Sequence, residues 1–262
     1  MAGDLDVGAW LARLGGRLVA LVEWRQRSVR FAQAVVELEP GDAAGAMERV
    51  FVEAFCDRGR EPRAIAESAL IAVADRIWPR EHRTATQEAA RELDRRLVAL
   101  FLSDPREIAP DETISFPVPD YGEGRMLTLG ERRALATMPS RRMLDRVIRD
   151  PHPMVTVKLL ANPKLKESDV VRMAARRPAP AEILLEIAMH PRWRRMRRVA
   201  LALIHNPYLP PRTAVTLLPA LDAREAAEVA ADNAIDGVVR EGARLLLAAA
   251  EKIRKPKGRS GR

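Results

Sequence analysis

The chain has 262 residues, is 47% hydrophobic and carries a formal charge of +8, with a pI near 10.3. A chain of this length can form one or two domains with a sizeable core. Its single cysteine, Cys56, excludes an intramolecular disulfide and a cysteine-ligated metal cluster. The apolar runs are shorter than the roughly 20 residues of a membrane span, and the first residues lack the basic region of a signal peptide. We therefore expect a cytoplasmic protein with no membrane association.

Aromatic residues make up only 4% of the chain, and β-branched residues do not alternate strictly with polar ones. Both features favour an all-α protein. Residues 1–103 are predicted to form an N-terminal helical bundle, because short turns separate four amphipathic stretches. These helices are expected at about 5–38, 43–56, 62–77 and 84–102, with Gly15-Gly16 a candidate bend in the first and Thr84 with Gln87 a capping box in the last.

Residues 104–127 are rich in proline and glycine, which exclude a long helix. We interpret them as a connector, although the apolar side chains near Tyr121 would let part of it pack along a neighbouring surface. Residues 254–262 form a basic, apolar-poor tail that we expect to be disordered.

Residues 128–253 read as a row of short helices separated by similar breaks. Asn162-Pro163 and Asn206-Pro207 are two of these breaks, because the residue before a proline avoids the helical conformation. Thr128 with Glu131 forms a capping box and Ser140 is an N-cap candidate. Helices are expected at about 130–137, 141–149, 154–161, 167–176, 181–189, 194–205, 211–220, 222–231 and 235–253.

The Asp150-Pro-His-Pro break is followed by Val-x-x-x-Leu-x-Ala-Asn-Pro-x-Leu, which ends at Leu165. This pattern resembles the leucine-rich repeat variant proteins of bacteria and, more loosely, HEAT-type α-solenoids. The resemblance covers roughly residues 128–245 and implies stacked helices that share one continuous core. The founding member of that group carries a cysteine-ligated iron–sulfur module, which a chain with one cysteine cannot reproduce. The predicted fold is thus an N-terminal helical bundle followed by an α-solenoid.

The positive charge is concentrated in residues 130–212, which hold eighteen basic and seven acidic side chains. On a helix over 194–205 the arginines would share one outer face, which either is simply solvated or binds an anion. Trp193 at its edge could stack on a base or a guanidinium. The candidate partner-binding residues are Arg192, Trp193, Arg194, Arg195, Arg197, Arg198, Arg141, Arg142, Arg146 and Arg149.

No pattern in the sequence predicts a catalytic site, a cofactor or a metal, and three of the four histidines lie at helix breaks, where we expect structural roles. We therefore predict a non-enzymatic scaffold that presents the Arg-rich face to an acidic partner protein. The alternative is a nucleic-acid-binding protein that uses the same arginines to contact phosphates. A third interpretation is that the N-terminal bundle self-associates and the solenoid is a spacer.

Overall fold

The computed structural model describes residues 6–56, 59–74, 76–103 and 115–254. All regular elements in these ranges are helices, which confirms the all-α prediction. They belong to two compact units: unit 1 combines Met1–Asp104 with Leu218–Arg262, and unit 2 is Pro105–Leu217. Parts of the predicted connector (104–114) and of the predicted tail (255–262) lie outside the described residues.

Unit 1 is built around α3 and α4. Helix α4 packs against α1, α2 and α3, and α3 also contacts α5 and α6. Two edge-to-face aromatic pairs lie in the core, Phe31 with Trp78 and Phe51 with Phe101. The elements of unit 1 are α1 (Val7–Ala20), α2 (Trp24–Val35), α3 (Pro40–Phe55), α4 (Arg60–Ala74), α5 (Arg80–Glu92), α6 (Arg96–Leu102), η1 (Leu218–Ala220), α14 (Ala223–Ala231) and α15 (Gly237–Arg254).

Two of the four helices expected in residues 1–103 are each divided in two. The first breaks between α1 and α2 rather than at Gly15-Gly16, which stays helical. The fourth is divided into α5 and α6 near Asp94, which has a positive φ of 54°. Because α5 begins at Arg80, the predicted capping box at Thr84 is wrong. The Gln87 side chain instead donates a hydrogen bond to the Ala99 carbonyl, at 3.2 Å.

The C-terminal helices group with the N-terminal ones, whereas the expected boundaries placed residues 128–253 in one domain. Helix α15 packs on α3 and α6, and η1 packs on α3. Val239, Ala243, Leu246 and Ala250 are buried at helical spacing along α15. Burial of this apolar stripe explains why α15 joins unit 1.

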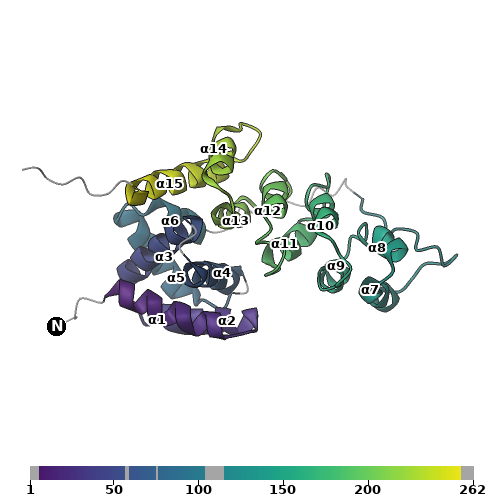
Figure 1. The fold of residues 1–262 in the computed structure, drawn as a ribbon, viewed down its shortest axis with the longest axis horizontal. Helices are drawn as coiled ribbons and strands as arrows, with labels where there is room; N and C mark the ends of the chain where they lie inside the picture. The colour runs from purple at the N-terminus through teal and green to yellow at the C-terminus, as the bar shows by residue number, and fades with distance from the viewer. Residues whose placement is uncertain (1–5, 57–58, 75, 104–114, 255–262) are drawn as a thin grey trace, which may run out of the picture. The chain divides into compact units, whose positions relative to one another are not determined.

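Over residues 115–217, unit 2 contains seven short helices that follow one another closely. Helices α7, α9, α11 and α13 contact one another in order, and α10 contacts α12 (Figure 1). The Thr128–Glu131 capping box and the Ser140 N-cap are both present, as predicted. The helices are α7 (Leu129–Thr137), α8 (Arg141–Val147), α9 (Pro153–Leu160), α10 (Glu167–Ala174), α11 (Ala181–Met189), α12 (Arg197–Ile204) and α13 (Pro211–Leu217).

In each of two breaks between helices of unit 2, a buried asparagine side chain forms hydrogen bonds to the end of an earlier helix. The Asn162 amide donates to the carbonyls of Ala136 and Met138, at 2.8 and 2.9 Å. These carbonyls lie at the end of α7, where the helix itself supplies no donors. The Asn162 side-chain oxygen accepts a hydrogen bond from the Lys164 amide at 2.9 Å. The asparagine therefore fixes its own turn and joins it to a helix that ends more than twenty residues earlier.

Candidate anion-binding surface

The Arg-rich segment before α12 does not form the helix expected from residue 194. Residues 191–195 form a separate turn, and α12 begins at Arg197. The His190 ring accepts a hydrogen bond from the Arg192 amide at 3.3 Å, and the His190 carbonyl accepts one from the Arg194 amide at 3.1 Å. The prediction of one continuous arginine face on a helix over 194–205 is therefore wrong.

Trp193 is fully buried, so the prediction that it stacks on a ligand is also wrong. Its indole Nε1 donates to the Leu160 carbonyl at 2.8 Å, which satisfies the C-terminal end of α9. The Arg192 guanidinium lies over the ring, with its Cζ 4.1 Å from the ring centroid. Burial of a large aromatic ring with its N–H satisfied stabilises the fold, and this explains why the turn points the indole inward.

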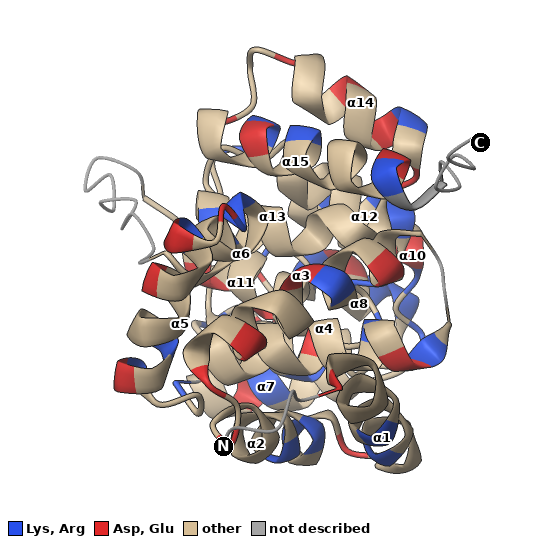
Figure 2. Ribbon diagram, turned by 90° about the vertical axis from the view of Figure 1, so that its left-hand side faces the viewer, with Lys and Arg blue, Asp and Glu red and all other residues tan. Residues whose placement is uncertain are grey.

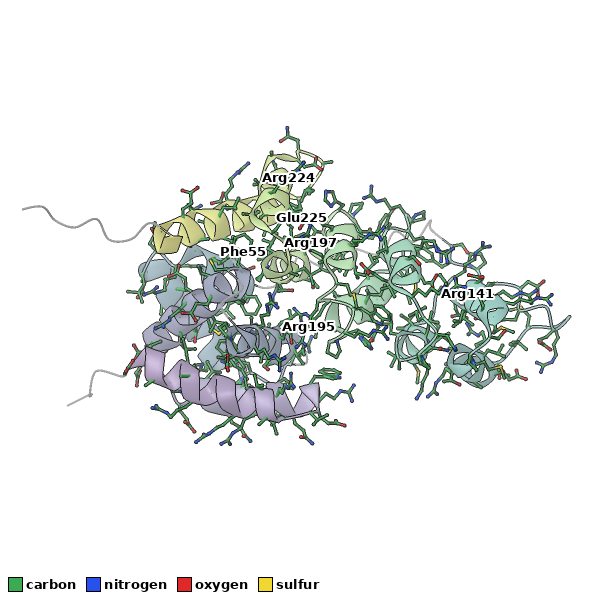
Figure 3. All side chains as sticks on the ribbon, in the orientation of Figure 1. Phe55, Arg141, Arg195, Arg197, Arg224 and Glu225 are labelled. Carbon is green, nitrogen blue, oxygen red and sulfur yellow. The ribbon has the colours of Figure 1, made fainter. Side chains whose placement is uncertain are left out.

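The neighbouring arginines have different environments. Arg194 is only 6% exposed, so it cannot form part of an open surface. Arg195, Arg197 and Arg198 are exposed; Arg195 precedes α12 and Arg197 is its first residue (Figure 3). The exposed charge of this segment is thus divided between a turn and the first turn of a helix.

Arg141 on α8 is exposed but already binds two carboxylates (Figure 3). It contacts Asp169 at 2.5 and 2.7 Å and Asp145 at 2.6 Å. Arg172 also binds Asp169, at 2.8 Å. The Arg141 guanidinium holds the pKa of the buried Asp169 carboxyl well below its usual range. Arg141 therefore joins α8 to α10, and we assign it a structural role.

Arg146 is also used within unit 2, because it donates to the Tyr121 carbonyl. The Tyr121 hydroxyl donates to Asp150 at 2.5 Å, and Arg132 binds both oxygens of Asp150 at 2.9 and 2.7 Å. Tyr121, Asp150 and Arg132 are all buried. Burial and the hydrogen bond to Asp150 raise the pKa of the Tyr121 hydroxyl. This cluster attaches the end of the connector to α7 and α8.

Sequence reasoning missed this cluster and the role of Arg141. The one local signal was Asp150 at the start of a helix break, where its Oδ1 accepts from the His152 amide at 2.9 Å. Arg132 lies 18 residues before Asp150, and Arg141 lies 28 residues before Asp169. A pattern confined to one helix and its caps does not report contacts at that separation.

The histidines at the breaks take part in local hydrogen bonds. The ring Nδ1 atoms of His152 and His190 accept from the amides of Met154 and Arg192, at 3.2 and 3.3 Å. His205 contacts the Leu201 carbonyl through Nδ1, at 2.8 Å. In the part of the chain that the structure describes, no group of three or more His, Cys, Asp or Glu side chains could hold a metal ion.

Four of the ten candidate residues are exposed side chains that form no ion pair with a carboxylate in the described ranges. Arg142, Arg149 and Arg198 make no side-chain hydrogen bond or ion pair with any residue in the described ranges. We define the exposed arginine set as Arg142, Arg149, Arg192 and Arg198. Arg195 and Arg197 are also exposed, but they make interactions of their own and do not belong to this set.

No family model, no curated protein and no solved structure matches this chain. The resemblance to leucine-rich repeat variant proteins therefore stays a prediction. Within the described ranges, none of the helices is both long and apolar enough to cross a membrane.

Proposed function

We propose that unit 2 is a short α-solenoid and a non-enzymatic interaction module, which binds an acidic segment of a partner protein through the exposed arginine set. The in-order contacts of α7, α9, α11 and α13 support the solenoid. In such an array each helix helps to bury its neighbours, and a surface larger than one helix stays open to a partner.

One observation carries the proposal. The buried carboxylates of unit 2 are already neutralised by arginines other than the exposed set: Asp150 by Arg132, and Asp169 by Arg141 and Arg172. Arg142, Arg149 and Arg198 are exposed and pair with no carboxylate in the described ranges, so their positive charge faces solvent. Arginine is suited to this role because its planar guanidinium binds carboxylates through two parallel hydrogen bonds.

The geometry favours a protein ligand over single-stranded nucleic acid. Binding of single strands relies on aromatic side chains that stack on the bases. Trp193 and Tyr121 are buried, and Phe116 and Tyr208 are only partly exposed, so residues 115–217 present no fully exposed aromatic ring. Duplex DNA needs no stacking, and we treat it as an outcome of the test.

The test compares a fluorescein-labelled poly-glutamate peptide with a labelled DNA duplex by fluorescence anisotropy. Binding is measured at about 50 and 200 mM salt, because contacts between exposed charges weaken as salt screens them. The test variant changes Arg142, Arg149 and Arg198 to Ala. A matched control changes Arg60, Arg80 and Arg91 to Ala. These three arginines are exposed on α4 and α5 of unit 1, and their replacement removes the same amount of charge.

We expect the wild type and the control to bind the peptide, and the test variant to bind about tenfold or more weakly. Equal binding by the test variant and the control would contradict the proposal. If the duplex binds and the peptide does not, and the test variant loses duplex binding, the arginine set contacts phosphates and the partner is nucleic acid.

A further inference from the structure

Helices α1 and α2 carry a concentration of positive charge that the rest of the N-terminal part lacks. Residues 7–36 contain five arginines and one acidic residue, Glu23, whereas acidic residues exceed basic ones over residues 1–129. Basic residues are visible on both helices in Figure 2. Arg13, Arg17, Arg25 and Arg30 are exposed, and no ion pair joins them to a carboxylate in the described ranges.

Residues 22–36 expose three valines at a spacing of seven residues. Val22, Val29 and Val36 are 93%, 43% and 38% exposed. They are three of the eight large hydrophobic residues exposed in the described part of the chain. Val29 lies on α2 and Val36 is its C-cap; because seven residues are close to two helical turns, these two valines follow one line along α2. Val22 lies in the bend before α2. An apolar line on the outer face of a helix needs an explanation, because single exposed apolar residues are ordinary but aligned ones are not.

Another face of α2 is committed to the core. Ser28, Phe31 and Val35 are buried where α2 packs against α4. The bend before α2 is held by Arg27, whose Nε donates to the Leu21 carbonyl at 2.7 Å. Because the buried face and the bend both fix the helix, Val29 and Val36 cannot turn inward without unpacking α2.

We propose that the exposed face of α2 is a docking site for an acidic amphipathic helix of a partner protein. On a helical wheel Val29 and Val36 lie within about 20° of each other, with Arg25 about 40° to one side of Val29 and Arg30 about 100° to the other. An amphipathic helix with apolar residues at three- and four-residue spacing packs along such a line, and its flanking carboxylates meet the arginines.

The charge and width of this surface argue against two other occupants, a second copy of the chain and a lipid surface. A second copy of the same face would oppose arginine with arginine, which costs free energy when like charges are brought together. The apolar line is one valine wide, which matches the seam between two helices and provides little area for insertion between lipids. The site lies in unit 1 and is independent of the exposed arginine set of unit 2.

The probe is a fluorescein-labelled, helix-forming peptide of about 21 residues, with leucines at three- and four-residue spacing and glutamates beside them. A scrambled peptide of the same composition has its leucines spread around the helix. The full chain is tested as wild type, as Val29→Ser with Val36→Ser, and as Arg25→Glu with Arg30→Glu. The control, Arg80→Glu with Arg91→Glu on α5, makes the same charge change. Circular dichroism checks that each variant keeps its helices.

We expect the wild type and the control to bind the amphipathic peptide at least about tenfold more tightly than the scrambled one. Both pairs of substitutions on α2 should lower that affinity by about tenfold or more. Absence of binding by the wild type, or equal binding of the two peptides, would overturn the proposal.

Two further measurements separate the other occupants. Sedimentation velocity tests whether the wild type is a dimer and whether Val29→Ser with Val36→Ser makes it a monomer. That result would identify a second copy of the chain as the occupant. Co-sedimentation with phosphatidylglycerol vesicles that depends on the same valines, without peptide binding, would identify a lipid surface. Either result would replace the helix-docking proposal.

Discussion

Asn162 and Asn206 are 44 residues apart and make the same three side-chain hydrogen bonds. Each amide donates to two carbonyls at the end of an earlier helix, Ala136 and Met138 for Asn162, and Ala174 and Arg176 for Asn206. Each side-chain oxygen accepts from the amide two residues later. The repeated hydrogen bonds indicate that both asparagines satisfy the free carbonyls at a helix end in the same way.

Replacing either asparagine by alanine should lower the free energy of unfolding by about 2–3 kcal/mol, because buried carbonyls would lose their donors. Urea denaturation followed by circular dichroism measures the change. The exposed Asn233 makes one surface hydrogen bond, to Arg240, so Asn233→Ala should cost less than about 1 kcal/mol. A cost for Asn162→Ala as small as that of the control would show that water replaces the amide.

Asp150→Asn should destabilise the chain by about 3–5 kcal/mol, because it leaves the buried Arg132 without its counter-charge. The thermal unfolding midpoint, measured by calorimetry, reports the loss. Asp145→Asn is the control, since that carboxylate is half exposed and its contact with Arg141 is worth about 1 kcal/mol at most. Equal midpoints for the two variants would show that the Asp150 cluster does not hold the connector to α7 and α8.

Gly15 and Gly16 should respond in opposite directions to replacement by alanine. A Cβ at Gly15 would lie 2.4 Å from the Cβ of Glu61, whereas a Cβ at Gly16 meets no atom within 4 Å. We expect Gly15→Ala to cost about 1–3 kcal/mol through steric overlap between α1 and α4. Gly16→Ala should stabilise α1 by about 0.5–1 kcal/mol, because alanine favours a helix interior. Chemical denaturation tests both, and a stabilising Gly15→Ala would refute the close approach of the two helices.

His190 should make stability depend on pH. Burial, with a smaller effect of Arg192, lowers the pKa of His190 to about 4, against about 6.5 in an unfolded chain. Between these values the unfolded state binds more protons, so the stabilisation is complete above about pH 6.5 and is lost as pH falls toward 4. Because the ring is partly exposed, we expect a loss of about 1–2 kcal/mol rather than the full value of the shift.

The measurement is urea denaturation at intervals from pH 7 to pH 4.5 for the wild type and for His190→Asn. Asparagine can still accept from the Arg192 amide but does not titrate. The difference in stability between the two proteins should therefore change with pH, in favour of the variant as pH falls. A constant difference over this range would show that His190 is not the group responsible.

The sequence by itself determined the helical class and most helix limits in unit 2, because the signals for them are local. Thr128 with Glu131, Ser140 and Pro211 act on backbone groups within one turn, and each begins a helix as predicted. Only the tertiary structure decided which arginines are free and where Trp193 lies. Trp193 reaches the Leu160 carbonyl, 33 residues earlier, and Arg141 reaches Asp169, 28 residues later. Side-chain burial depends on such distant neighbours, and the periodicity of a single helix does not contain them.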